Sequence, residues 1–174
     1  MSCKIREMHL EEYPLLRDFL YMAIYLPEGV EPPPESILDS PALQVYIAQF
    51  GSSRHDKALV AELDGKIVGA VWSRIMNDYG HLDDTTPSLA ISVCQSCRRQ
   101  GIGTALLQHL LVLLKASGYS KVSLSVQKAN FAVNLYRQNG FLIVAENSEE
   151  YIMAATLKKS SAKDIIASGN TSEI

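Results

Sequence analysis

The segment from Arg98 to Thr104 constrains this chain most, because it places two glycines between an apolar extended run and a long apolar helix. The run before it, Ser88 to Val93, has the composition of a strand, and a helix is predicted over Gly101 to Ser117. Such a junction presents unpaired N–H groups and the positive end of a helix dipole, and glycines let a ligand approach the main chain. The junction therefore predicts a pyrophosphate site, to which Arg98 and Arg99 add positive charge.

Around this junction, apolar residues recur with the period of a strand or of a helix. Asp64-Gly65 between two apolar runs predicts a tight hairpin. Because a helix joins the strand at 88–93 to the strand at 122–126, these two should be parallel. We predict an α/β fold with a mixed, mostly antiparallel sheet flanked by helices. The expected strands are 3–8, 58–63, 67–75, 88–93, 122–126, 141–145 and 151–157, and the expected helices are 10–25, one from near Ser36 or Ser40 to before Gly51, 101–117 and 130–139.

Composition limits the class of protein. A length of 174 residues suits one domain, which we predict over 1–158, with a flexible tail over 159–174. A net charge of −3 without a dense Lys/Arg block argues against a nucleic-acid partner, and no apolar stretch approaches the roughly 20 residues of a membrane span. The N-terminus lacks the pattern of a signal peptide, and three cysteines cannot all pair, so we predict a cytoplasmic protein.

Other interpretations of the glycine segment and of the cysteines are weaker. A Walker A loop ends in Gly-Lys-Ser/Thr, whereas Thr104 follows Gly103 directly, and a Rossmann loop has a small residue where this chain has Leu106. Cys94 and Cys97 form a C-x-x-C without a second ligand pair. We therefore predict two free thiols and no metal site.

Two motifs together resemble those of the GNAT (Gcn5-related N-acetyltransferase) superfamily. The first is Arg98-Arg99-Gln100-Gly101-Ile102-Gly103, which matches the family's Arg/Gln-x-x-Gly-x-Gly/Ala pyrophosphate loop. The order of elements extends the resemblance over roughly 3–158, and it implies a parallel central pair of strands splayed at the cofactor site. The second motif is the later Asn-x-Ala-x-x-Leu-Tyr-x-x-x-Gly-Phe signature, formed here by Asn130, Ala132, Leu135, Tyr136, Gly140 and Phe141.

The resemblance implies acetyl-CoA as the co-substrate and a role for each matched residue. Main-chain groups of the strand at 88–93 would pair with the pantetheine arm, the loop amides would hold the pyrophosphate, and Asn130 would meet the arm from the other side. Tyr136, one helical turn after Ala132, would place its hydroxyl near the thioester sulfur and protonate it. The implied cofactor-binding residues are Ile91, Ser92, Val93, Arg98, Arg99, Gln100, Gly101, Ile102, Gly103, Thr104, Asn130, Ala132 and Tyr136.

Plainer roles remain open for these residues. Tyr136 lies on a helix that buries one face, so it is alternatively a core aromatic. Asn130 is alternatively a helix cap, a role compatible with a cofactor contact.

The acceptor amine and its base are sought in two other segments. We place the acceptor between the loop Leu26–Pro34 and the segment Tyr79–Asp84, where acidic and aromatic side chains would attract a cationic amine. The strand at 88–93 carries no Glu or His, so the base is sought just before it, with Asp83 as the candidate and His81 through a water as the alternative. A solvated loop is the competing interpretation. The substrate-binding candidates are Glu28, Tyr79 and Asp83.

The predicted function is therefore transfer of an acetyl group from acetyl-CoA to the amine of a small molecule or peptide by direct attack. Two alternatives remain: a non-catalytic CoA-binding sensor or assembly module, and an acyltransferase using a longer acyl-CoA. The oligomeric state is open, with a homodimer among the alternatives.

Overall fold

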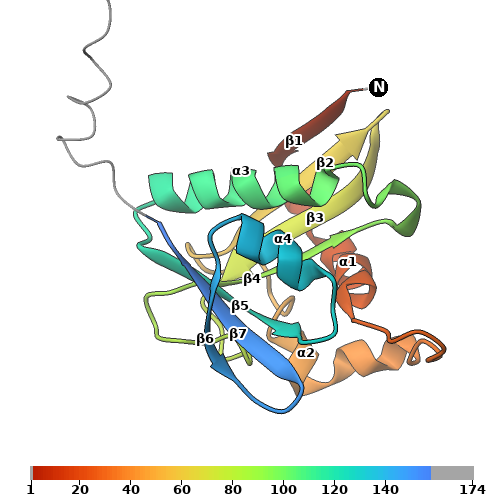
Figure 1. Cartoon of the computed structure of the whole chain (residues 1–174). Helices are drawn as coiled ribbons and strands as arrows, with labels where there is room; N and C mark the ends of the chain where they lie inside the picture. Colours follow the sequence, from red (N-terminus) through yellow and green to blue (C-terminus); the bar gives the residue numbers. More distant parts are fainter. Residues whose placement is uncertain (1, 158–174) are drawn as a thin grey trace, which may run out of the picture.

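The computed structural model describes residues 2–157, so the tail predicted over 159–174 lies outside the described residues. Seven strands form one sheet with helices on both faces (Figure 1). The strands are β1 (Cys3–Glu7), β2 (Lys57–Leu63), β3 (Lys66–Arg74), β4 (Ser88–Val93), β5 (Lys121–Gln127), β6 (Leu142–Glu146) and β7 (Glu150–Thr156). The helices are η1 (Leu10–Leu15), α1 (Leu16–Ala23), η2 (Glu35–Asp39), α2 (Pro41–Gln44), η3 (Gln95–Cys97), α3 (Ile102–Ala116) and α4 (Ala132–Gln138).

The sheet confirms the predicted fold class. Its strand order is β1-β2-β3-β4-β5-β7-β6, and every neighbouring pair is antiparallel except β4 and β5, which are parallel. The hairpin between β2 and β3 turns at Asp64 and Gly65, whose φ angles of 51° and 77° are both left-handed. Two left-handed residues match the twist of the flanking strands, which explains why the Asp-Gly pair predicted this turn correctly.

The hydrophobic core lies in two layers, one on each face of the sheet. Side chains alternate between the faces along a strand, so Val71 of β3 packs under α3 while its neighbour Trp72 packs on the side of α1. The α3 layer is completed by Leu106, Leu107, Leu110 and Leu114, all fully buried. Both faces are therefore covered, as the mostly apolar strands β3 and β4 require. Within residues 2–157 no helix is both long and apolar enough to cross a membrane.

Two predicted helices differ from the observed ones. The helix expected over 10–25 begins as the 3-10 turn η1, because Pro14 cannot donate a backbone hydrogen bond. The second ends at Gln44, although we expected it to continue past Tyr46. The carbonyls that follow accept side-chain donors of β3 instead: Trp72 Nε1 bonds the Tyr46 oxygen, and Arg74 Nη1 bonds those of Val45 and Ala48.

The parallel pair β4 and β5 is joined at one end only. Its ladder has a single bridge, Ser88 to Ser123, beside the bond from Ser123 N to Pro87 O. Near this end Gly80 of the β3–β4 connection lies against the β5 backbone, and its carbonyl accepts a 2.6 Å hydrogen bond from Ser123 Oγ. The two strands diverge toward Val93 and Gln127, which leaves a gap in the middle of the sheet.

The close approach of Gly80 generates the first prediction. A Cβ built there would lie 2.9 Å from the Leu124 carbonyl carbon and 3.0 Å from Ser125 N, and backbone atoms cannot move aside cheaply. We expect Gly80→Ala to lower the free energy of unfolding by about 1–3 kcal/mol, the usual range for overpacking. Gly103→Ala is the control, because its Cβ would meet only Leu135 Cδ2 at 3.8 Å and Val93 Cγ2 at 3.9 Å. Urea denaturation of both variants measures the difference, and an unchanged midpoint for Gly80→Ala would contradict it.

Candidate functional site

The two sequence motifs meet at a hollow between the start of α3 and the start of α4. Its volume is ≈ 480 Å³. The glycine loop forms one wall and α4 with the residue before it forms the other, so segments some 30 residues apart in the chain face each other. The lining residues are Arg98, Arg99, Gly101, Gly103, Thr104, Phe131, Ala132, Asn134, Leu135 and Gln138.

The loop backbone is shaped to present amides to this hollow. Gly101 is the N-cap of α3 with a φ of 81°, and Arg99 adopts a φ of 61° although it has a side chain. A left-handed non-glycine residue costs about 1–2 kcal/mol, so the surrounding structure must hold Arg99 in place. The first helical bond runs from Ala105 N to Gly101 O, so the amides from Ile102 to Thr104 precede the helical hydrogen-bond ladder.

Glycine at 103 keeps the hollow open. A side chain there would extend toward Leu135 and Val93, with ordinary contacts rather than clashes. The protein itself therefore has room for a Cβ at this position, and its absence serves whatever occupies the hollow.

Arg98 holds the loop to the preceding strand. Its Nε donates a 3.0 Å hydrogen bond to Val93 O at the end of β4. Gln100 Nε2 makes a longer bond of 3.4 Å to Ser96 O. The Arg98 charge thus lines the hollow and, at the same time, fixes the position of the loop.

Alternate residues of β4 direct their main-chain N–H and C=O groups into the gap between β4 and β5. Cys94 N donates to Val68 O, so the even-numbered residues of β4 direct their backbone groups to β3 and the odd-numbered ones to β5. The main-chain groups of Ile91 and Val93 therefore face the gap, from which they could pair with an extended ligand. Those of Ser92, for which we predicted the same role, face β3 instead, and its Oγ donates to Phe19 O of α1.

The positions of Asn130 and Tyr136 agree with a helix cap and a core aromatic, the alternative roles given above, and they also allow the cofactor roles. Asn130 Oδ1 accepts a 2.9 Å hydrogen bond from Ala132 N, which caps the first turn of α4. Tyr136 is 7% exposed and packs against Phe141 with ring centroids 5.7 Å apart. Burial raises the pKa of the Tyr136 phenol, so the hydroxyl stays protonated at neutral pH and can act as a donor.

The predicted acceptor residues do not come together. In Figure 1 the β3–β4 connection, which carries Tyr79 and Asp83, lies at the lower left, whereas the α1–α2 connection, which carries Glu28, lies at the far right. All three residues are exposed. The reason is that the first connection packs against the beginning and middle of β5, through Gly80, while Tyr25 OH of the second bonds Ala129 O beyond the end of β5.

Asp83 is committed to its own turn. Its Oδ1 accepts hydrogen bonds from Thr85 N at 2.8 Å and Thr85 Oγ1 at 2.7 Å. These bonds, with smaller contributions from Thr86, lower the pKa of the Asp83 carboxyl to about 2, which makes it a weak base. His81, the alternative base, lies with Nε2 3.5 Å from Asp84 Oδ1.

A different carboxyl lies beside the last residue of β5, the strand that forms the other side of the gap. Glu150 begins β7 opposite Gln127, the last residue of β5, and Gln127 Nε2 donates to Glu150 Oε1 at 3.1 Å. Burial, followed by the nearby charge of Glu149, raises the pKa of the Glu150 carboxyl. The sequence contains the acidic turn 146–150, but it did not indicate that strand pairing would place the Glu150 carboxylate beside the last residue of β5.

Glu150 and Tyr136 lie on opposite faces of the sheet. The apolar side chains of β5, such as Leu124, pack in the α3 layer together with Tyr136, so Ser125 and Gln127 point to the α1 face. Tyr46, from the turn after α2, is half-buried on that side near Ser125, Asp78 and the charge of Glu150. The two groups are therefore separated by the sheet, a proton donor on the α3 face and a carboxylate on the α1 face.

The sequence predicts that Cys94 and Cys97 are free thiols and that the chain has no metal site. Cys94 and Cys97 are free, half-buried thiols. The described part of the chain contains no group of three His, Cys, Asp or Glu side chains arranged to hold a metal ion.

Comparisons with known proteins agree with this geometry. The model of the Acetyltransferase (GNAT) family matches residues 13–141. An N-alpha-acetyltransferase of Sulfurisphaera tokodaii is 37% identical over 114 residues, which are 56% of this chain and 68% of that protein.

Solved structures share the fold. An acetyltransferase of the GNAT family from Streptococcus pneumoniae superposes with a TM-score of 0.67 at 24% identity, over 90% of this chain and 100% of that one. A PaiA N-acetyltransferase from Thermoplasma acidophilum, solved in complex with coenzyme A, has a TM-score of 0.66 at 20% identity, over 90% of this chain and 99% of that one.

Proposed function

The chain belongs to the GNAT family of acetyltransferases, and from that premise we propose that it transfers the acetyl group of acetyl-CoA directly to an amine, most suitably the α-amino group of a peptide. The observation that carries the proposal is the hollow between the glycine loop and α4, because the loop directly follows β4, the strand that forms one side of the gap. A nucleotide at the hollow can extend an arm past Gly103 into this gap, so that a thioester reaches the middle of the sheet. The α-amine follows from the Sulfurisphaera relative, whose name specifies that group.

In the proposed complex the pyrophosphate lies at the start of α3. The N–H groups of Ile102 to Thr104 would donate to its oxygens, and the helix adds about half a positive charge at this end. Arg98 and Arg99 supply further positive charge. Along the arm, the main-chain groups of Ile91 and Val93 would pair with its amides from one side and Asn130 from the other.

The transfer needs an oxyanion donor, an acid for the sulfur and a base for the amine. The amine nitrogen forms a bond to the thioester carbonyl carbon, and the carbonyl oxygen takes the negative charge. The Val93 N–H, which faces the gap, supports this oxygen. The carbon–sulfur bond then breaks, and Tyr136 gives its proton to the departing thiolate.

Glu150 is the base that we propose in place of Asp83. An α-amine arrives largely as the ammonium form and must lose one proton before attack and a second afterwards. Glu150 lies beside the end of β5 on the face opposite Tyr136, from which it would approach the amine, and its raised pKa makes it a better proton acceptor than an ordinary carboxylate. Gln127 holds the carboxylate in place.

Incubation with acetyl-CoA and a panel of amines tests the function. Free thiol is measured, and the modified atom is located by mass spectrometry on short peptides, peptides blocked at the N-terminus, lysine and polyamines. We expect thiol release with acetylation at the α-amine. Binding of CoA without release from any amine would favour the non-catalytic module, and faster release from a longer acyl-CoA would favour the other alternative.

A valine at position 103 should weaken cofactor binding without unfolding the protein. The side chain would fill the hollow through which the arm must pass, while its Cβ has room in the free protein. We expect Gly103→Val to raise the Kd for CoA at least about tenfold, or 1.4 kcal/mol. His109→Val is the control, because it places the same residue on an exposed position of α3. Calorimetric titration decides, and equal affinities in two folded variants would remove the basis of the cofactor assignment.

Tyr136→Phe should separate catalysis from binding. The substitution keeps the packing against Phe141 and deletes only the proton donor. General acid catalysis contributes on the order of 10²–10⁴-fold, so we expect kcat to fall by that factor while CoA affinity and thermal stability stay constant. Turnover equal to that of the wild type, under conditions where chemistry is rate-limiting, would reduce Tyr136 to a packing residue.

The two candidate bases make opposite predictions. We expect Glu150→Gln to lower kcat/KM about 10²-fold or more, whereas Asp83→Asn leaves it unchanged because that carboxylate serves its own turn. A base works when deprotonated, so in the wild type kcat/KM should fall with decreasing pH through a pKa above that of an ordinary Glu.

In the Glu150→Gln variant, this fall of kcat/KM at acidic pH should disappear. The pH dependence that comes from protonation of the substrate's own α-amine should remain. If Asp83→Asn loses activity and Glu150→Gln keeps it, the sequence-based assignment of Asp83 is the correct one.

A further inference from the structure

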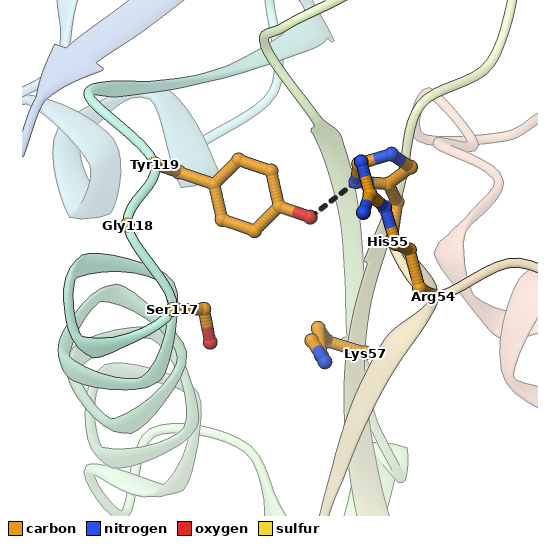
Figure 2. A pocket seen from close by; sticks show the side chains of 6 residues that line it. All are labelled: Arg54, His55, Lys57, Ser117, Gly118 and Tyr119. Atoms are coloured by element: carbon orange, nitrogen blue, oxygen red, sulfur yellow. Dashed lines mark hydrogen bonds between the residues drawn. The ribbon is translucent and has the colours of Figure 1, made fainter.

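A second hollow lies at the far end of α3, away from the cofactor loop. Its volume is ≈ 330 Å³, and it opens between the turn before β2 and the turn after α3. Figure 2 shows Arg54, His55 and Lys57 on one wall, with Ser117 and Tyr119 across from them. A straight helix of 15 residues is about 22 Å long, so this hollow is distinct from the acyl-transfer site.

The charges around this hollow are unbalanced. Arg54 and Lys57 line it, and no carboxylate among residues 2–157 does. The nearest acid in sequence, Asp56, points away: its oxygens accept bonds from Arg74 Nε and Nη2 and from Gly51 N, and its side chain is 1% exposed. Two cationic side chains therefore share one concave surface without a neutralising partner among its lining residues.

Polar groups on both walls complete the surface. Tyr119 OH and His55 Nδ1 form a hydrogen bond of 2.5 Å across the mouth, drawn as a dashed line in Figure 2. This bond fixes the imidazole and leaves its Nε2 for a ligand. Ser117, whose hydroxyl donates to Leu113 O at 2.8 Å, lies across the hollow from Lys57. Cationic and imidazole groups around one concavity are donors that bind oxyanions in proteins.

The end of a helix offers a competing explanation, because its partial negative charge attracts cations. Three of the last four carbonyls of α3 already have partners, however. Leu113 O accepts from Ser117 N, Leu114 O from Tyr119 N and Lys115 O from Gly118 N. Basic side chains are therefore not required as caps for these three carbonyls.

We propose that the hollow formed by Arg54, His55, Lys57, Ser117 and Tyr119 binds a small oxyanion, a phosphate or a carboxylate, at a site separate from acyl transfer. Arg54 and Lys57 supply the charge, and the hydrogen-bonded pair of His55 and Tyr119 forms the rim. The proposal does not depend on the acceptor or on the mechanism described above.

The test is a titration of the full chain with inorganic phosphate, and separately with acetate, followed by amide chemical shifts in NMR spectra. The double variant Arg54→Gln/Lys57→Gln removes the charges, and Lys115→Gln is the matched control, because Lys115 is exposed on the same helix end but does not line the hollow. We expect saturable shifts at Ser117 to Tyr119 in the wild type and in the control. The double variant should bind at least about tenfold more weakly, since charge-assisted hydrogen bonds are lost.

The cofactor loop supplies an internal reference. Phosphate binding at Gly101 to Thr104 should follow one curve in all three proteins, because that end of α3 is unchanged. Equal responses of Ser117 to Tyr119 in the wild type and the double variant would overturn the proposal, as would no saturable response in the wild type. If the wild type binds no phosphate and the double variant is less stable than the wild type, Arg54 and Lys57 stabilise the C-terminal end of α3 instead of binding an anion. Of the two anions, the one that saturates at lower concentration identifies the ligand class.

Discussion

The single bridge between Ser88 and Ser123 is the feature on which the rest of the molecule depends. A full parallel ladder between β4 and β5 would close the sheet, and the main-chain groups of Ile91 and Val93 would be used within it. Instead the strands separate after one bridge. Leucines of α3 pack across β2, β3 and β4 on one face, and the bond from Ser123 to Gly80 fastens the joined end on the other. The sheet therefore keeps its order although its centre is open.

The loop after β4 links this gap to the start of α3. Arg98 returns to the carbonyl of Val93, so the strand that borders the gap and the loop that presents amides are held together by one hydrogen bond. Arg99 is left-handed at a cost of about 1–2 kcal/mol, which a charge-assisted hydrogen bond can offset. In the proposed complex, the distance from pyrophosphate to thioester is then set by one strand and one turn, both anchored in the core.

Sequence reasoning succeeded where local rules and the fold agree. Asp64-Gly65 and Gly101 lie at left-handed positions that few other residues adopt easily. The apolar run 88–93 predicted β4, and the period of two predicted β5, almost to the residue. The predictions from sequence failed where the structure of a segment depends on residues far away in the chain. Arg74 and Trp72 take the carbonyls that would have continued α2, and nothing near Val45 in the sequence announces them. The position of Glu150 depends on the register of β7 against β5, and the separation of Glu28 from Asp83 depends on which end of β5 each connection meets. The main-chain direction of Ser92 follows from the β3 register in the same way.

The open sheet also separates the two proton-transfer groups of the proposed mechanism. Burial raises the pKa of both Tyr136 and Glu150, so the phenol stays protonated and the carboxylate becomes a stronger base. If both groups lay on one face, the carboxylate could take the phenol proton directly and neither would serve the substrate. With the sheet between them, the two groups do not contact each other directly. In the proposed complex, the cofactor would lie on the side of α3 and the amine would approach from the side of α1, so that an acceptor could be exchanged while the nucleotide stays bound.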